Sequence, residues 1–150
     1  FVSIKAARSF IAQLVENYGE CVPHPLTKEN AFIFPTAEKL AMASLEEIKT
    51  TNVRKQTIRD IAKLTIENAI NFSIPQDLAV ARAKLLEIRG IGPWTADYIC
   101  LRALSDTDAF PKTDLVLKRV LEKHPDIDLE KLQPWRSYAA IYLWKEYHTK

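Results

Sequence analysis

The sequence predicts an all-α fold, and three features of its 150 residues lead to that prediction. Glycine occurs only three times. The alternation of apolar and polar residues that is typical of half-buried strands is almost absent. Apolar residues recur instead at intervals of three and four, as they do on the buried face of an amphipathic helix.

The N-terminal segment is predicted to form the first helix, which ends near Gly19. Its apolar stripe consists of Ile4, Ala7, Ile11, Leu14 and Tyr18. Residues 21–35 contain three prolines, so we predict a loop there. The short apolar run 31–34 inside this loop is expected to be a buried connector.

The middle of the chain is predicted to contain four helices. A short helix follows Pro35, and a second begins at Ser44, which forms a capping box with Glu47. The buried face of a longer third helix consists of Ile58, Ile61, Ala62, Thr65, Ile66 and Ala69. The fourth starts within residues 73–76, where Pro75 suits a first helical turn. Its inward face consists of Leu78, Ala81, Leu85 and Ile88.

Two more helices are expected near the C-terminus, over residues 113–121 and 134–147. The chain shows no internal repeat and no low-complexity linker, so residues 1–150 are expected to form one domain. Neither an initiator methionine nor a leader segment stands at Phe1. We therefore expect the sequence to be a fragment that lacks upstream residues.

Charge and cysteine content narrow the possible functions. The net charge of +2 is too small to indicate nucleic-acid binding by itself, so any DNA contact must come from local charge and backbone geometry. Cys21 and Cys100 lie far apart, which excludes a four-cysteine iron–sulfur or zinc cluster, and we expect both to be reduced thiols. Apolar runs are only a few residues long, so we expect a cytoplasmic protein without a membrane partner.

The most informative stretch is Gly90-Ile91-Gly92-Pro93, which joins two predicted helices. Pro93 suits the first turn of a helix because its missing N–H would have no partner there. The two glycines permit positive φ and let another backbone approach closely. The amides around Gly90, Ile91 and Gly92 are then expected to point outward beside a helix N-terminus, which favours binding of a phosphate.

A Gly-x-Gly triplet alone is compatible with any tight turn between helices. The full pattern over residues 88–99, apolar-x-Gly-Ile-Gly-Pro-x-x-Ala-x-x-Ile, is more specific. It resembles the helix-hairpin-helix motif, which binds a DNA phosphate without reading sequence. In that motif a monovalent cation often sits on backbone carbonyls. The resemblance implies Na⁺ or K⁺ on the carbonyls of Leu86, Ile88 and Ile91, and no other cofactor.

Two further segments extend the resemblance. Residues 108–119, DAFPKTDLVLKR, are similar to the segment that carries the aspartate of the helix-hairpin-helix DNA glycosylase superfamily. Residues 133–144, QPWRSYAAIYLW, resemble the C-terminal helix of its inducible bacterial 3-methyladenine glycosylase branch, type II. Phe34-Pro35-Thr36 and Val2-Ser3 also fit this branch.

The resemblance implies a helical domain with a DNA cleft between two lobes. It also implies a monomer that acts in base-excision repair on double-stranded DNA. The bases removed after flipping would be alkylated purines such as 3-methyladenine and 7-methylguanine.

Asp114 is the candidate catalytic residue. Cleavage of an N-glycosidic bond develops positive charge on C1′ and O4′ of the deoxyribose. An ionised carboxylate stabilises that charge and can orient or deprotonate the attacking water. By its local sequence alone, Asp114 is better explained as an exposed residue that caps the helix starting after Thr113. The aligned motif favours the catalytic role.

Trp94 distinguishes two modes of catalysis. Relatives that also cut the DNA backbone carry a lysine at this position, which forms a Schiff base with the sugar. Such relatives often carry an iron–sulfur cluster as well, and its cysteines are missing from this sequence. Both differences imply hydrolysis by water. A bifunctional glycosylase/lyase is the alternative within this enzyme class.

Trp94, Tyr98 and Trp144 match the aromatic positions that line the damaged-base pocket of the type II branch. Alkylation at N3 or N7 makes a purine cationic, and a cation over an aromatic face gains about 0.5–2 kcal/mol. Three aromatic residues on helices are also compatible with a hydrophobic core. Phe1 matches the position of an apolar wedge that fills the gap left by the flipped base.

Two alternatives lie outside this enzyme class. A non-catalytic DNA-binding module would use the hairpin only to hold a phosphate, but such a module has no need of Asp114. An all-α interaction scaffold leaves the Gly-Ile-Gly-Pro turn and the three aromatic residues unexplained. The basic residues around the hairpin could approach phosphates, although a solvated helix face explains each equally well. They are Arg82, Lys84, Arg89 and Arg102.

Overall fold

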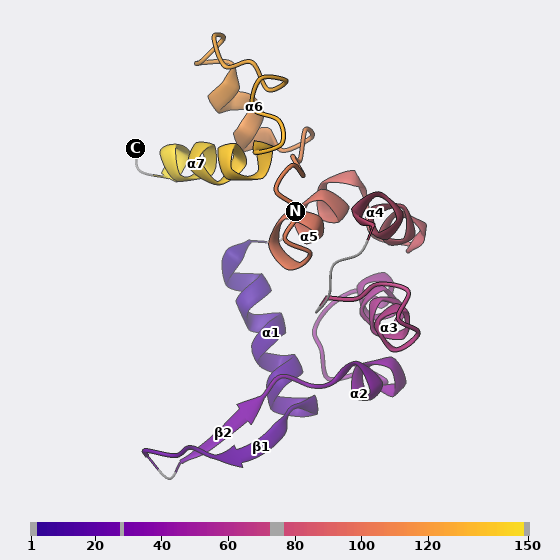
Figure 1. Ribbon diagram of the computed structural model, residues 1–150. Coiled ribbons are helices and arrows are strands. Elements are labelled where there is room, and N and C mark those ends of the chain that lie inside the picture. Colours follow the sequence, from indigo (N-terminus) through magenta and orange to yellow (C-terminus); the bar gives the residue numbers. More distant parts are fainter. Residues whose placement is uncertain (1–2, 28, 73–76, 149–150) are drawn as a thin grey trace. The chain divides into compact units, whose positions relative to one another are not determined.

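The computed structural model describes residues 3–27, 29–72 and 77–148. The chain divides into two compact units, Phe1–Ala69 and Ile70–Lys150, and each is described by itself. Over the described ranges the structure contains seven helices and one two-stranded sheet (Figure 1). The predicted helical class is confirmed, with the small sheet as an addition.

The first unit begins with α1 (Ile4–Tyr18), which confirms the predicted N-terminal helix. The side chain of Ser3 caps its start. The helix ends at Gly19, whose amide donates to the Val15 carbonyl. A Cβ atom at Gly19 would collide with the carbonyl oxygens of Val15 and Ile33, so only glycine fits where the end of α1 approaches the sheet.

The loop predicted over residues 21–35 is wrong. The chain forms two antiparallel strands there, β1 (Glu20–Pro23) and β2 (Asn30–Ile33), with Cys21 opposite Phe32. The short apolar run inside this stretch is not a buried connector either, because its three large apolar residues are about half exposed. A ribbon of two strands that pair with each other leaves much of its surface uncovered, so its apolar side chains reach solvent.

Helices α2 (Ala37–Met42) and α3 (Asn52–Ile66) pack against each other and complete the first unit. Threonine side chains cap both starts: Thr36 accepts a hydrogen bond at the start of α2 and Thr51 at the start of α3, each at 3.4 Å. The buried core of this unit consists of Leu14, Leu40, Leu45, Ile48 and Ala62.

The helix predicted to begin at Ser44 does not form. The Ser44 hydroxyl accepts a hydrogen bond from the Glu46 amide, and the Glu47 carboxylate accepts one from the Tyr18 hydroxyl. Leu45 takes a positive φ of 57°, and its side chain is fully buried. Tertiary contacts of Leu45 and Glu47 therefore override the local capping signal.

The longer middle helix is confirmed as α3, but its end differs from the prediction. The helix stops at Ile66, and Asn68 turns the chain with a φ of 52°. Ala62 is buried and Ile58 packs on the core, as predicted. Ile66 is largely exposed and Ala69 lies beyond the helix, so neither belongs to its buried face.

The first described helix of the second unit is α4 (Leu78–Glu87). The start predicted within residues 73–76 lies outside the described residues. The helix is capped by Asp77, whose carboxylate accepts hydrogen bonds from the Ala79 and Val80 amides at 2.9 and 3.1 Å. Its predicted inward face is confirmed by the partial burial of Leu78 and the burial of Ala81, Leu85 and Ile88.

Three more helices follow: α5 (Pro93–Ala103), α6 (Leu115–Leu121) and α7 (Arg136–His148). The last two correspond to the two helices predicted near the C-terminus. Helix α4 contacts α5, and α6 contacts α7. The core around α5, α6 and α7 consists of Leu101, Phe110, Leu117, Val120, Ala140 and Leu143. Among the described helices, none combines the length and the apolar character that crossing a bilayer requires.

Candidate active site

The predicted hairpin forms between α4 and α5. Gly90 takes a φ of 101°, which favours glycine, and the Ile91 amide closes the turn on the Ile88 carbonyl at 3.0 Å. Gly92 has an extended backbone, with φ −93° and ψ 175°, and is the N-cap of α5. Only Gly90 therefore uses the conformational freedom of glycine. Pro93 occupies the first turn of α5, as predicted.

The N-terminus of α5 is open. Gly92 offers no side-chain cap, and a Cβ atom added there would meet no neighbouring atom within 4 Å. The first amides of a helix have no acceptor within the helix and carry the positive end of its dipole. This geometry suits an anion such as a phosphate.

An ion pair joins the two helices of the hairpin. The Nε atom of Arg82 lies 2.6 Å from Oδ1 of Asp97, whose side chain is only 12% exposed. The hydrogen bond to Asp97 also raises the pKa of the Arg82 guanidinium. Arg82 thus stabilises the hairpin from within, whereas the sequence suggested it as one of several possible phosphate contacts.

Asp114 is the N-cap of α6, and its side chain is buried. Its Oδ1 atom accepts a hydrogen bond from the Leu117 amide at 2.9 Å, so the capping role is confirmed. The residue is only 7% exposed, which is low for an aspartate that merely caps a surface helix. A buried carboxylate requires further hydrogen-bond partners.

Two tryptophans supply these partners. The indole Nε1 of Trp94 donates to Oδ2 of Asp114 at 2.7 Å, and that of Trp144 donates to Oδ1 at 3.3 Å. Burial by itself raises the pKa of Asp114. Hydrogen bonds from the Leu117 amide, the two indoles and the Val116 amide outweigh that effect and hold the pKa below its usual value. Asp114 is therefore ionised at neutral pH.

The three aromatic residues predicted to line a base pocket lie together. The rings of Trp94 and Tyr98 stack with their centroids 5.1 Å apart and their planes inclined by 12°. Tyr98 also contacts Trp144, at a centroid distance of 5.8 Å and an angle of 55°. Tyr98 is 37% exposed, and both tryptophans are partly buried. The structure thus brings the three rings together, and the two tryptophans among them bond to the carboxylate of Asp114.

Several expectations stay predictions. Phe1, the expected wedge, lies outside the described residues. The expected cation ligands, the carbonyls of Leu86, Ile88 and Ile91, lie at the end of α4 and in the turn after it. Leu86 belongs to the last turn of α4, whose carbonyls lack donors within the helix, and such oxygens fit an alkali cation. The DNA cleft between two lobes also stays a prediction.

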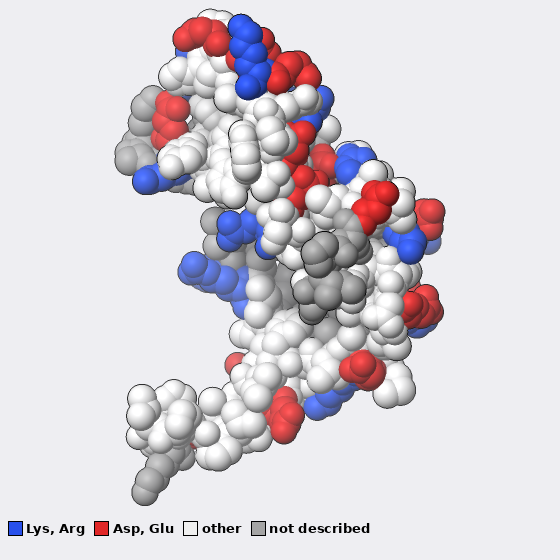
Figure 2. Space-filling view, in the orientation of Figure 1, with Lys and Arg blue, Asp and Glu red and all other residues white. Residues whose placement is uncertain are grey.

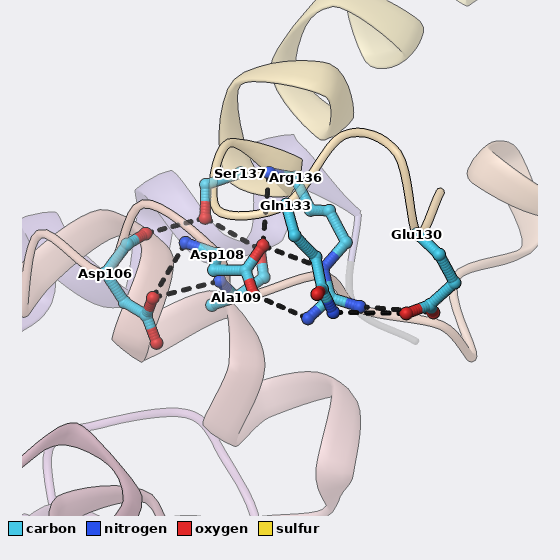
Figure 3. A network of polar contacts seen from close by, with 7 residues as sticks. All are labelled: Asp106, Asp108, Ala109, Glu130, Gln133, Arg136 and Ser137. Atoms are coloured by element: carbon cyan, nitrogen blue, oxygen red, sulfur yellow. Dashed lines mark hydrogen bonds and ion pairs between the residues drawn. The ribbon is translucent and has the colours of Figure 1, made fainter. Parts of the chain in front are cut away.

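Asp108, Arg136 and Ser137, which have no role in the sequence-based predictions, form a polar network on the segment that ends in Asp114 (Figure 3). Nε of Arg136 lies 2.8 Å from Oδ1 of Asp108. The sequence gives no signal for this ion pair beyond the presence of Asp108 in one motif segment near the C-terminus and of Arg136 in the other.

Charged side chains of both signs are intermingled on the C-terminal unit as Figure 2 draws it. The net charge of the chain is only +2. Contacts with a polyanion are therefore expected from individual groups placed by the fold. The backbone amides at the open N-terminus of α5 are groups of this kind.

Three curated proteins resemble the chain over nearly its whole length. One is the probable bifunctional transcriptional activator/DNA repair enzyme AlkA of Mycobacterium tuberculosis, 33% identical over 95% of this chain. The DNA-3-methyladenine glycosylase of Bacillus subtilis is 31% identical over 96% of this chain. DNA-3-methyladenine glycosylase 2 of Escherichia coli is 29% identical over 95%. The chain is homologous to these DNA-3-methyladenine glycosylases.

The match covers only part of each relative. The chain spans 30% of the length of the M. tuberculosis protein and 52% of each of the other two. No protein-family profile matches it.

Solved structures agree with the helix-hairpin-helix glycosylase fold. The 3-methyladenine DNA-glycosylase of Archaeoglobus fulgidus aligns with a TM-score of 0.73 at 24% identity, over 95% of this chain and 52% of that one. The 8-oxoguanine glycosylase/lyase of Clostridium acetobutylicum, in complex with double-stranded DNA, aligns with a TM-score of 0.75 at 21% identity. That alignment covers 98% of this chain and 54% of the other. At these identities the likeness establishes the fold alone.

Proposed function

We propose that this chain is a monofunctional DNA glycosylase that acts in base-excision repair. The observation that carries the proposal is Asp114, a buried and ionised carboxylate that accepts hydrogen bonds from Trp94 and Trp144. Burying a charge costs free energy, and ionisable groups in such settings concentrate at functional sites. The names of the relatives, two 3-methyladenine glycosylases and a DNA repair enzyme, support the same activity.

Asp114 stabilises positive charge on the sugar. When the N-glycosidic bond breaks, positive charge appears on C1′ and O4′ of the deoxyribose, and a fixed negative charge nearby lowers the energy of that state. A carboxylate has about four acceptor sites. Indole and amide donors already occupy most of those on Asp114. Asp114 therefore acts chiefly through its charge and by orienting water, and less as a base.

The substrates are alkylated purines, among them 3-methyladenine and 7-methylguanine. These bases are cationic, and each favourable contact of a cation with an aromatic face contributes about 0.5–2 kcal/mol. Trp94, Tyr98 and Trp144 offer such faces next to Asp114. The base reaches them after flipping out of the duplex. Because alkylation also weakens the glycosidic bond, moderate stabilisation of the sugar cation suffices.

Hydrolysis by water follows from Trp94. Glycosylases that also act as lyases use a lysine amine at the matching position as the nucleophile. Trp94 has no amine, and its indole N–H donates to Asp114. Water is then the nucleophile, and the DNA strand with the abasic site stays intact.

The partner is double-stranded DNA that contains alkylated bases, bound by a monomer in the bacterial cytoplasm. Amides around Gly90 and Gly92, at the open N-terminus of α5, hold a phosphate, a contact that positions the protein without reading bases. The open space at Gly92 supports this assignment. The Ile91 amide is already bonded to the Ile88 carbonyl. The carbonyls of Leu86, Ile88 and Ile91 would hold a Na⁺ or K⁺ ion, which would add positive potential to the hairpin and take no part in the chemistry.

Base release from methylated duplex DNA, resolved by lesion, tests the proposal. We expect free 3-methyladenine and 7-methylguanine, and a strand that stays intact until the abasic site is cleaved by alkali. Borohydride added to the reaction should trap no covalent protein–DNA adduct. A trapped adduct would assign a glycosylase/lyase, and duplex binding without base release would assign a non-catalytic DNA-binding module.

A further inference from the structure

Residues 106–114, the segment that ends in Asp114, are bonded to the N-terminus of α7. Arg136 forms a two-point ion pair with Asp108, in which Nε lies 2.8 Å from Oδ1 and Nη2 lies 2.5 Å from Oδ2. The side chain of Arg136 is only 15% exposed, and that of Asp108 is 29% exposed. Paired bonds between a guanidinium and a carboxylate fix geometry as well as neutralise charge.

Ser137 adds a second set of bonds to the same segment. Its hydroxyl lies 2.6 Å from the Asp106 carbonyl and 2.7 Å from the Ala109 carbonyl. Its amide donates to the Thr107 carbonyl at 2.9 Å. Ser137 is almost completely buried. Figure 3 shows how the bonds of the Ser137 hydroxyl and the ion pair connect the start of α7 with residues 106–109.

Helix α7 also contacts Asp114 itself. Trp144 lies about two turns after Arg136 on this helix. Its indole N–H donates to Oδ1 of Asp114 at 3.3 Å. Both ends of the segment 106–114 are thus attached to one rigid element. The distance between the Asp114 carboxylate and the Trp144 indole therefore depends on the bonds of Arg136 and Ser137 to the start of the segment.

The segment's own hydrogen bonds are local. The amides of Asp108 and Ala109 donate to the Asp106 carboxylate at 2.8 and 3.1 Å, as in an Asx turn. Such a turn fixes the shape of the segment but not its position relative to another helix. The bonds from Arg136 and Ser137 attach the start of the segment to α7, while the Trp94 indole bond to Asp114 and the burial of Phe110 hold the rest.

We propose that Asp108 and Arg136 are positioning residues for the reaction, because their ion pair sets the placement of the Asp114 carboxylate against Trp144. The inference rests on the proposed glycosylase function and extends it to residues outside the base pocket. A misplacement of about 1 Å in a catalytic group costs on the order of 10²-fold in rate. Loss of the ion pair therefore slows base release and leaves the affinity for undamaged duplex unchanged.

Glu130 provides a matched control. Its carboxylate faces the same guanidinium, with Oε1 3.6 Å from Nη1 of Arg136, but its side chain is 71% exposed. Both Glu130→Gln and Asp108→Asn remove one negative charge next to Arg136. Only Asp108→Asn loosens the segment that leads to Asp114. A general electrostatic effect on base release would appear in both variants, whereas a positioning effect appears in Asp108→Asn alone.

Single-turnover base release separates these cases. The rate constant of Asp108→Asn should fall by roughly 10- to 100-fold, while Glu130→Gln keeps the wild-type value. Arg136→Lys retains the charge but loses the two-point geometry, so it should show an intermediate loss. The rate constant, unlike the amplitude, does not depend on the folded fraction. A wild-type rate constant in Asp108→Asn, or an equal loss in Glu130→Gln, would overturn the proposal.

An NMR measurement tests the geometry without activity. The chain has three tryptophans, so single tryptophan-to-phenylalanine variants assign the indole N–H signals. In Asp108→Asn the Trp144 signal should move toward its position in Asp114→Ala, where the acceptor is gone. In Glu130→Gln it should stay in place.

The two measurements distinguish the failure of the function from the failure of the inference. If the wild-type protein releases no base but the Trp144 signal moves in Asp108→Asn, the proposed function fails. The effect of the Asp108–Arg136 ion pair on the contact between Asp114 and Trp144 is then still supported. If the wild-type protein is active and the signal does not move, the positioning role of Asp108 and Arg136 is refuted.

Discussion

The indole nitrogen of Trp94 lies 2.7 Å from Oδ2 of Asp114, and the ring of the same residue stacks on Tyr98. One side chain therefore connects the carboxylate proposed to face the sugar with the aromatic surface proposed to receive the base. Where lyase relatives carry a lysine, this chain carries a hydrogen-bond donor to its own carboxylate. A change at Trp94 should alter the ionisation of Asp114 as well as the binding of the base.

Trp94→Phe should move the acid limb of the activity profile to higher pH. The variant keeps a ring for Tyr98 but removes a hydrogen bond that helps to hold the pKa of Asp114 below its usual value, so the pKa should rise. Activity requires the ionised carboxylate and is lost as the pH falls through that pKa. Single-turnover base release as a function of pH measures the limb.

The control for this experiment is Trp135→Phe, since Trp135 is 57% exposed and its ring contacts only Tyr138 among the described aromatic pairs, at an angle of 58°. It should keep the wild-type profile. An acid limb that does not move in Trp94→Phe would show that the indole N–H has no part in the ionisation of Asp114.

Two variants separate the two proposed roles of Trp144. Trp144→Phe keeps an aromatic face and loses the donor to Asp114, so excision of cationic and neutral lesions should slow by a similar factor. Trp144→Ala also removes the ring. Losing about 1 kcal/mol of cation-specific stabilisation should change the ratio of 3-methyladenine to hypoxanthine excision by about fivefold.

Both lesions are measured on one preparation of each Trp144 variant. Truncating the partly buried Trp144 costs up to about 3–5 kcal/mol of folding free energy, but the folded fraction cancels from the ratio. If the ratio in Trp144→Ala equals that of the wild-type protein, Trp144 does not contact the flipped base.

Gly92 and Gly90 should respond differently to valine. Gly92→Val should fold normally, because its backbone is extended and the new Cβ has open space. It should nevertheless weaken binding to damaged and undamaged duplex alike, since the side chain occupies the space of the phosphate. Gly90→Val should lower the free energy of unfolding by about 1–3 kcal/mol, because a φ of 101° strains a β-branched residue.

Thermal unfolding and duplex-binding titrations measure these two effects separately. A loss of affinity in Gly92→Val that is confined to one type of lesion would contradict the phosphate role of the hairpin.

The helices and the hairpin could be predicted because their signals are local. The apolar periodicity of α1 and α4 and the Gly-Ile-Gly-Pro turn each lie within a few residues of sequence. The β1–β2 ribbon could not, because its pairing joins residues that are not neighbours and its prolines indicate a loop. The helix at Ser44 failed for a related reason: burial of Leu45 at a positive φ decides that turn.

Most of the candidate site could be predicted, since Trp94, Tyr98, Asp114 and Trp144 all stand in recognisable motifs. The direction of the two indole N–H groups could not, because a sequence shows a ring but not where it points. The ion pair between Asp108 and Arg136 could not be singled out either. With 21 basic and 19 acidic residues in the chain, opposite charges separated by 28 positions form no recognisable pattern.

Asp114 should also contribute to folding stability in a pH-dependent way. Its pKa is lower in the folded than in the unfolded chain. Its contribution is complete above the ordinary aspartate pKa of about 3.9 and is lost as the pH falls through the folded-state value. Asp114→Ala removes the cap and the charge and should cost about 0.5–2 kcal/mol at pH 7.

Denaturant unfolding of the wild-type protein and Asp114→Ala across pH checks this prediction. The difference in unfolding free energy should shrink as the pH falls below about 3.9. A difference that stays constant down to strongly acidic pH would contradict a lowered pKa for Asp114.

The central claim is that the charge of Asp114 drives base release, and Asp114→Asn tests it most directly. Asparagine keeps the size of the side chain and the ability to cap α6, but it carries no charge. We predict that single-turnover release of 3-methyladenine falls by on the order of 10²–10³-fold or more, while affinity for the same duplex is nearly unchanged. An Asp114→Asn protein that retains most of the wild-type rate constant would contradict the claim.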